Sequence, residues 1–231
     1  MRQNVVIFTG AGISAESGLD TFRDQNGLWK QYDAQKLASA SGFYENTQEA
    51  LNFYNARRKQ LLEVEPNSAH KRLAELEKWH NVTIITQNVD NLHERAGSSH
   101  VIHLHGELTK VTSSNDRLDP KCIKDYPLDI PIKIGDKAED GSQLRPFVTM
   151  FEEYVFGMDV AKDYVKYADI FVVIGTSLTV HPAANLIHHP HPEVPKFIIN
   201  PSDIEIPEGY VFIKDIATKG VDQLMDILIN I

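Results

Sequence analysis

Polar residues that can do chemistry follow several short apolar runs of this sequence. These groups are Gly10-Ala11-Gly12, Gln87-Asn88-Val89-Asp90, His105-Gly106, Gly175-Thr176-Ser177 and Asn200. In an open parallel sheet, ligands bind beyond the carboxyl ends of the strands. Taken singly, an Asn, Asp or Ser in such a place is an ordinary helix cap. Taken together, the groups predict one crevice that binds a large polar ligand.

Residues 10–15 have the spacing of a dinucleotide fingerprint. Gly10-x-Gly12-x-x-Ala15 follows the apolar run Val5–Phe8, which predicts a buried strand. In this interpretation Gly10 allows a tight turn and Gly12 lets a pyrophosphate approach the backbone. Ala15 lets the next helix pack on the sheet, with its N-terminus aimed at the phosphates. Alone the pattern is weak, because many strand-to-helix turns carry two glycines.

A simple dehydrogenase is the obvious competing interpretation. It requires an acidic residue about 20 positions after the glycines, at the end of a second strand, to bind ribose hydroxyls. Here that region reads Leu28-Trp29-Lys30-Gln31-Tyr32-Asp33 and contains no strand pattern. The fingerprint is therefore present without the usual dehydrogenase sequel.

His105 is the strongest candidate for a general base. It directly follows the apolar run Val101–Leu104, and the adjacent Gly106 leaves room around its ring. A neutral imidazole accepts protons near neutral pH. We interpret other histidines as core or surface residues, namely His70, His93, His103, His181, His188, His189 and His191. A metal site among the last of these is disfavoured, because Pro190 and Pro192 break the helical spacing that would aim the rings together.

The composition bounds the class of protein. The 231 residues, 42% of them hydrophobic, suit one domain or one domain with a sizeable insertion. No apolar run reaches membrane length and no signal peptide is evident, so we expect a cytoplasmic protein with no membrane partner. The net charge of −9 and the absence of a basic block argue against nucleic-acid binding. The lone Cys122 excludes a disulfide framework and a Cys-based zinc cluster.

Strand patterns alternate with helix patterns along the chain, which predicts an α/β fold with a parallel sheet. The expected strands are 5–8, 82–86, 101–104, 170–174, 197–199 and 211–213. The expected helices are 47–63, one capped by Asn67 or Ser68, about 89–96, about 158–168, 182–188 and 221–229. Residues 111–145 are polar and rich in Pro and Gly, so we expect a loop-rich module with some local strands or turns.

Longer motifs of the chain resemble those of the sirtuins, which are NAD-dependent protein-lysine deacylases. The motifs occur in family order and are Gly10–Gly18, Thr21-Phe22-Arg23, Thr86–His93, His103-Leu104-His105-Gly106 and Gly175-Thr176-Ser177. Ala38 followed by Phe53-Tyr54-Asn55-Ala56-Arg57-Arg58 resembles the bacterial and mitochondrial branch that removes acidic acyl groups. The resemblance implies NAD as cofactor and acylated lysine proteins as substrates.

The resemblance also implies residue roles. In the family's reaction the acyl carbonyl oxygen attacks C1′ of the nicotinamide ribose, nicotinamide leaves, and His105 as base activates a ribose hydroxyl. The products are free lysine, nicotinamide and O-acyl-ADP-ribose. Phe22 shields the reactive face from water. The implied NAD-binding residues are Gly10, Ala11, Gly12, Ser14, Ala15, Thr21, Phe22, Arg23, Trp29, Gln87, Asn88, Asp90, Gly175, Thr176, Ser177, Asn200, Pro201, Ser202 and Ala217.

The implied substrate-binding residues are Ala38, Tyr54, Arg57, Val148 and Phe151. Tyr54 and Arg57 are three apart on a helix and share a face, so a guanidinium and a phenol could together bind a carboxylate. Without the resemblance, Tyr54 would be read as a packed residue and Arg57 as a solvated one.

The chain departs from the family pattern at several positions. Ser113 and Ser114 stand where the first pair of zinc-binding cysteines would lie, so we predict no metal and a small module held by packing, around Ile123, Tyr126, Leu128, Ile130, Ile132 and Ile134. Asp20 replaces a frequent Pro, and Phe147 a frequent His. Met150-Phe151-Glu152-Glu153 lacks the family's Gly, which puts the shape of the substrate groove in question.

We therefore expect one sirtuin-type domain, 1–231, with a Rossmann-like parallel sheet and a small domain formed by two insertions. The large domain comprises about 1–30, 71–106 and 145–231, and the small domain about 31–70 and 107–144. We expect a monomer. Two alternatives remain open: a protein ADP-ribosyltransferase and a non-catalytic NAD-binding module.

Overall fold

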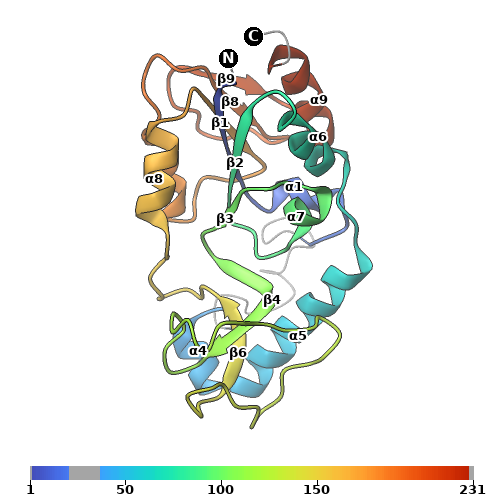
Figure 1. The fold of residues 1–231 in the computed structure, drawn as a ribbon, viewed down its shortest axis with the longest axis vertical. Coiled ribbons are helices and arrows are strands. Elements are labelled where there is room, and N and C mark those ends of the chain that lie inside the picture. Colours follow the sequence, from blue (N-terminus) through green and yellow to red (C-terminus); the bar gives the residue numbers. More distant parts are fainter. Residues whose placement is uncertain (1, 21–36, 229–231) are drawn as a thin grey trace.

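The computed structural model describes residues 2–20 and 37–228 (Figure 1). Thr21, Phe22, Arg23 and Trp29, to which the resemblance assigns roles, lie outside these residues. The strands are β1 Asn4–Thr9, β2 Asn81–Thr86, β3 Val101–His103, β4 Gly106–Ser113, β5 Lys124–Asp125, β6 Leu144–Val148, β7 Ile170–Ile174, β8 Lys196–Ile199 and β9 Tyr210–Ile213. The helices are α1 Gly12–Ala15, α4 Ala40–Glu45, α5 Thr47–Glu63, α6 Ser68–Leu76, α7 Leu92–Ala96, α8 Met158–Lys166, the 3₁₀ helix η1 Ala183–His188 and α9 Ala217–Leu228.

A six-stranded parallel sheet in the order β3-β2-β1-β7-β8-β9 forms the larger part of the molecule. Both faces of its central strands are buried, because successive side chains point to opposite faces. Val5 and Ile7 pack with α6 and α9, whereas Val6 and Phe8 pack with α8 and η1. Figure 1 shows these two helical layers on either side of the sheet. The expected α/β fold with a Rossmann-like sheet is confirmed.

A second module lies below the sheet in Figure 1 and contains α4, α5 and the antiparallel sheet β5-β4-β6. The polar segment 111–145 thus contributes strands at both its ends, and it pairs them in a sheet of its own. Arg58 of α5 is fully buried and donates hydrogen bonds to the backbone carbonyls of Leu108 and Pro127. The domain boundaries given above stay a prediction, and the one at 144/145 falls within β6.

The core of this module differs from the expected set. Ile132 is buried, and Tyr126 and Leu128 pack against its cluster, but Ile130 and Ile134 are exposed. A buried ion pair takes a central place instead. The guanidinium of Arg145, 1% exposed, donates to both carboxylate oxygens of Glu153, and its nitrogen–oxygen distances are 2.6 and 3.2 Å. A buried charge of this kind is tolerated only because it is paired.

Several predicted element boundaries are wrong. α7 begins at Leu92 rather than near 89, because the Asp90 carboxylate accepts the Leu92 N–H and holds the preceding residues as a loop. α9 begins at Ala217, four residues before the expected start. β4 and α4 were not expected as regular elements. By contrast, α5 matches its predicted bounds, and Asn67 caps α6 by accepting the backbone N–H groups of Ala69 and His70.

The turn after β1 packs directly against the end of β7. The Gly12 N–H donates to the Gly175 carbonyl at 2.8 Å, and the Gly10 N–H donates to the Ile174 carbonyl at 3.0 Å. A Cβ atom on Gly12 would lie 2.7 Å from the Gly175 Cα, which is closer than real contacts allow. Glycine at position 12 is therefore explained by this close approach of two backbone segments, and not only by an approaching pyrophosphate.

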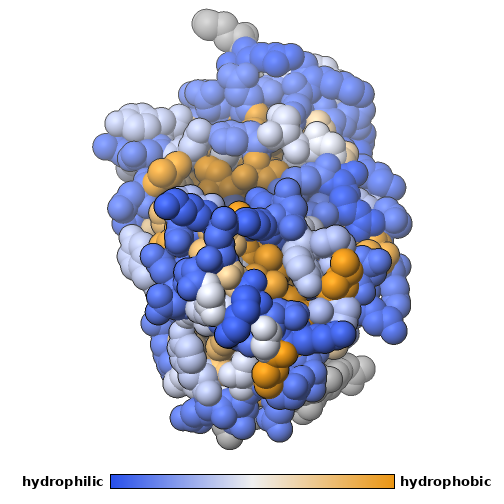
Figure 2. Space-filling view, turned by 60° about the horizontal axis from the view of Figure 1, so that its bottom comes forward, coloured by the Kyte–Doolittle hydropathy of each residue, from blue (hydrophilic) through white to orange (hydrophobic). Residues whose placement is uncertain are grey.

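Within residues 2–20 and 37–228, no helix is long and apolar enough to cross a membrane. Figure 2 shows one face of the molecule, on which an elongated hydrophobic patch is bordered by hydrophilic side chains.

We predict that Gly175→Ala destabilises the fold far more than Gly135→Ala. Both glycines have a positive φ, +64° and +91°, so both substitutions introduce about 1–2 kcal/mol of backbone strain. At Gly175 the new Cβ would also lie 2.5 Å from the Ile13 nitrogen, whereas nothing lies within 4 Å at Gly135. Urea unfolding should show that Gly175→Ala lowers the free energy of unfolding by about 3 kcal/mol or more. Equal losses for the two variants would contradict the close packing.

Candidate active site

One cavity of about 550 Å³ lies at the carboxyl ends of the parallel strands, between the main sheet and the second module. Every polar group singled out at a strand end contributes to its wall. The implied NAD-binding residues that line it are Gly10, Ala11, Gly12, Ser14, Ala15, Gln87, Asn88, Asp90, Gly175, Thr176, Ser177, Asn200, Pro201, Ser202 and Ala217. His105 lines it too, as do Ala38, Tyr54, Arg57, Val148 and Phe151.

Ser14 links the two polar side chains of the 87–90 loop. Its hydroxyl donates to the Asp90 carboxylate at 3.0 Å and accepts from the Asn88 side-chain amide at 3.3 Å. The same Asn88 amide donates to the Gly10 carbonyl at 3.1 Å. Burial raises the pKa of the Asp90 carboxyl, while the hydrogen bonds from Leu92 N–H and Ser14 oppose that shift. Asn88 and Asp90 are both 7% exposed, so their positions are fixed before any ligand binds.

Two buried histidines, His70 and His93, lie next to Ser14 and Thr9. His70 Nε2 is 3.5 Å from the Ser14 hydroxyl, and His93 Nε2 is 3.1 Å from the Thr9 hydroxyl. Their rings pack edge to face with centroids 4.9 Å apart. Burial lowers the pKa of His70 to about 4 and that of His93 well below its ordinary value, so both rings are neutral at physiological pH.

The His105 ring is oriented by the carbonyl of Gln87, which lies 2.9 Å from Nδ1. A carbonyl oxygen only accepts, so Nδ1 carries the proton and Nε2 is the unprotonated acceptor. Burial lowers the pKa of His105, and the hydrogen bond to Gln87 offsets only part of that shift. The imidazole is therefore neutral at physiological pH and able to take a proton. Gly106 allows the β4–β6 pairing rather than opening space around His105, since a Cβ there would lie 2.1 Å from the Phe147 carbonyl oxygen.

The end of the cavity inside the second module combines apolar and polar side chains. Ala38, Phe53 and Leu61 are buried around it, while Tyr54 and Arg57 contribute a phenol and a guanidinium. Burial raises the pKa of Tyr54 to about 12, so the phenol keeps its proton and remains a donor. Burial lowers the pKa of Arg57, and the negative charge of Asp90 opposes that shift.

The opposite end is built by β7, β8 and the start of α9. Asn200 donates its side-chain amide to the Thr176 carbonyl at 2.9 Å and accepts the Ser202 N–H at 3.0 Å. The Thr176 hydroxyl donates to the Gln87 side-chain oxygen at 2.9 Å. These bonds connect three strand ends into one rigid rim.

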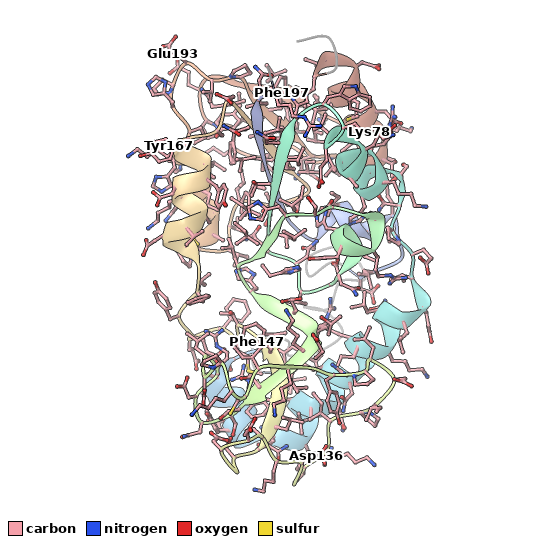
Figure 3. The ribbon with its side chains drawn as sticks, viewed as in Figure 1. Lys78, Asp136, Phe147, Tyr167, Glu193 and Phe197 are labelled. Atoms are coloured by element: carbon pink, nitrogen blue, oxygen red, sulfur yellow. The ribbon has the colours of Figure 1, made fainter. Side chains whose placement is uncertain are left out.

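In the segment after β6, Glu152 stands where the family pattern has a glycine. Glu152 has φ +76°, a left-handed conformation that glycine adopts more readily, and its carboxylate accepts the backbone N–H and hydroxyl of Ser41, each at 2.9 Å. Glu152 and Glu153 line the cavity. Phe147 does not line it, and Figure 3 shows this side chain near the junction of β4 and β6.

In the part of the chain that the structure describes, no group of three or more His, Cys, Asp or Glu residues is placed to hold a metal ion. Ser113 instead donates to the Asp140 carboxylate at 2.6 Å and lies 2.8 Å from the Ser142 hydroxyl. It also accepts the N–H groups of Asn115 and Asp116. This hydrogen-bonded cluster joins the two ends of the 113–142 segment. The absence of zinc stays a prediction.

The sequence patterns missed other residues of the cavity wall. Most are apolar, and no local signal singles them out: Leu19, Leu61, Leu108, Thr149, Val155, Val180, His181, Pro182, Ile199, Ile204 and Ile216.

Residues 10–182 match the model of the Sir2 family. The chain belongs to the Sir2 family. An "NAD-dependent protein deacylase" of Bacteroides thetaiotaomicron is 53% identical over 230 residues, which cover 98% of each chain. One of the same name from Helicobacter pylori is 48% identical over 99% of this chain and 98% of its own.

Solved structures agree with this membership. A mutant Sir2 homologue in complex with ADP-ribose has a TM-score of 0.87 and 35% identity over 98% of this chain and 92% of its own. A Sir2 homologue in complex with NAD has a TM-score of 0.84 at the same identity, over 98% and 90% of the two chains. A Sir2 protein with a deacetylated peptide and 3′-O-acetyl ADP-ribose has a TM-score of 0.79 and 29% identity, over 96% and 92% of the two chains.

In this Sir2 protein, His105 should titrate below its ordinary pKa of 6.5 and carry its proton on Nδ1. Proton–nitrogen NMR spectra of the imidazole nitrogens measure both properties, with a His105→Asn variant assigning the signals. A pKa of 6.5 or higher, or a neutral ring protonated on Nε2, would contradict the geometry.

Proposed function

We propose that this protein is an NAD-dependent protein-lysine deacylase that removes acidic acyl groups, succinyl and malonyl, as well as acetyl. The main support for this proposal is that one cavity is lined by the neutral imidazole of His105, the strand-end residues and the guanidinium of Arg57. Family membership and the names of its relatives support NAD dependence and protein deacylation.

The donors and acceptors of the wall suit NAD. A nicotinamide carboxamide has one carbonyl and one NH₂ group, and the buried Asp90 carboxylate can accept from that NH₂. Asn88 lies beside it, joined through Ser14. Gln87 would contact the ribose, and Thr176, Ser177 and Asn200 would hold the adenosine side. NAD supplies an electrophilic ribose carbon and a hydroxyl that accepts the acyl group.

His105 would act as the general base. Its Nε2 would take the proton of a ribose hydroxyl. The Nδ1–H group would keep its hydrogen bond to the Gln87 carbonyl, and this bond would stabilise the imidazolium that forms. The buried side chain of Val148 lines the same cavity and would limit the access of water to the reacting groups.

Arg57 and Tyr54 would recognise the acyl carboxylate. They lie one turn apart on α5 and line the same end of the cavity, next to the small Ala38. A guanidinium and a carboxylate form charge-assisted hydrogen bonds, and these are stronger where water is scarce. An acetyl group is too short and has no charge to use this pair. We also propose a monomer without nucleic-acid partners in the cytoplasm.

We predict that His105→Ala lowers kcat for acetyl-, malonyl- and succinyl-lysine peptides by about 10²–10⁴-fold, the usual contribution of a general base. NAD binding, measured by calorimetry, should stay within about threefold, because the wall on the nicotinamide and adenosine sides is unchanged. An ADP-ribose mass added to the peptide would favour a transferase. Bound NAD without acyl loss from any peptide would favour a binding module.

We predict that Arg57→Met lowers kcat/KM for a succinyl-lysine peptide by about 10–100-fold, since a hydrogen bond to a charged group contributes about 1.5–3 kcal/mol. Deacetylation should fall by far less. Lys59→Met, an exposed neighbour on the same helix, is the matched control and should leave both activities near the wild-type level. Equal loss of both activities in Arg57→Met would refute the assignment.

A further inference from the structure

His103 contacts the loop that also orients His105. His103 Nδ1 lies 3.0 Å from the Asn88 carbonyl oxygen, and His105 Nδ1 lies 2.9 Å from the Gln87 carbonyl oxygen. Two histidines at the end of β3 thus hold two consecutive carbonyls of the loop that carries Asn88 and Asp90. In the sequence His103 had no role beyond that of a core or surface residue.

The second nitrogen of His103 distinguishes it from His105. Its Nε2 lies 2.7 Å from the Glu94 carboxylate, and the His103 side chain is only 7% exposed. Carbonyl and carboxylate oxygens accept hydrogen bonds but do not donate them. Both ring nitrogens must therefore carry protons for both bonds to form, so His103 is an imidazolium whereas His105 is neutral.

The charges around His103 support this state. Glu94 faces it from α7, Glu107 from β4 and Asp90 from the loop, while Lys110 pairs with Glu107 at 2.6 Å and His93 is neutral. Burial lowers the pKa of His103, but the hydrogen bond and charge of Glu94, with the charge of Glu107, outweigh it, so the pKa lies above 6.5.

We propose that doubly protonated His103 is a positioning residue, which holds the Asn88 carbonyl and thereby keeps the 87–90 loop in the geometry that binds the nicotinamide end of NAD. The inference rests on the function proposed above. When the pH rises and His103 loses a proton, one of its two bonds is lost. The remaining proton stays on Nε2, because the charged Glu94 carboxylate is a stronger acceptor than the Asn88 carbonyl. The loop is then released and productive NAD binding weakens.

The test is the pH dependence of KM for NAD in wild type and in Glu94→Gln. KM should rise at alkaline pH in wild type, and Glu94→Gln should abolish that rise, because the Gln amide can donate to Nε2 and leave the ring proton on Nδ1 for the Asn88 carbonyl. Glu63→Gln, an exposed residue of α5 with the same change in charge, should leave the profile in place. Superimposable profiles for wild type and Glu94→Gln would overturn the proposal.

A second pair of variants separates positioning from packing. His103→Gln keeps an N–H donor for the Asn88 carbonyl and does not titrate, so its KM should stay near the neutral wild-type value and lose the alkaline rise. His103→Leu should raise KM by about tenfold at all pH values, the effect of one lost hydrogen bond. Equal KM values in both variants would overturn the proposal. If wild type removed no acyl group, the proposed function would fail, and calorimetric NAD binding over the same pH range would still decide the role of His103.

Discussion

The contact between two glycine-containing backbone segments determines how the rest of this protein can be arranged. The turn after β1 and the end of β7 approach so closely that Gly10, Gly12 and Gly175 have no room for a Cβ atom. This contact aligns the two central strands of the parallel sheet at their carboxyl ends. The wall of the cavity is built outward from it, through Ser14 to the 87–90 loop and through Thr176 to Asn200.

The cavity and its wall contain ionisable groups that differ in protonation state because their surroundings differ. His105 is neutral because it is largely removed from solvent and hydrogen-bonded only to a carbonyl among the described residues, while His103, two residues away, is charged because a carboxylate faces it. Arg57 and Asp90 place opposite charges in the same cavity. Groups whose pKa values are shifted by burial and by neighbouring charges are typical of catalytic sites.

Much of the main sheet could be predicted from the sequence, because apolar runs such as Ile170–Ile174 are buried on both faces and leave a strong pattern. The strand-end residues could be predicted to lie together, because the carboxyl ends of parallel strands meet at one edge of the sheet. The strands of the second module were harder to predict from the sequence. β4 has only two apolar side chains, Leu108 and Val111, and a register shift between Glu107 and Val111 breaks the period of two that predicts a strand. The pairing of Ser113 with Asp140 joins residues far apart in the chain. The packing reason for Gly12 likewise depends on a segment more than 150 residues away.

Mass spectrometry of the complete reaction of a succinyl-lysine peptide, NAD and the protein tests the proposed deacylation most directly. We expect one nicotinamide and one O-succinyl-ADP-ribose for each lysine freed, with no reaction when NAD is omitted. Free succinate released without consumption of NAD, or a peptide that gains ADP-ribose and keeps its acyl group, would contradict it.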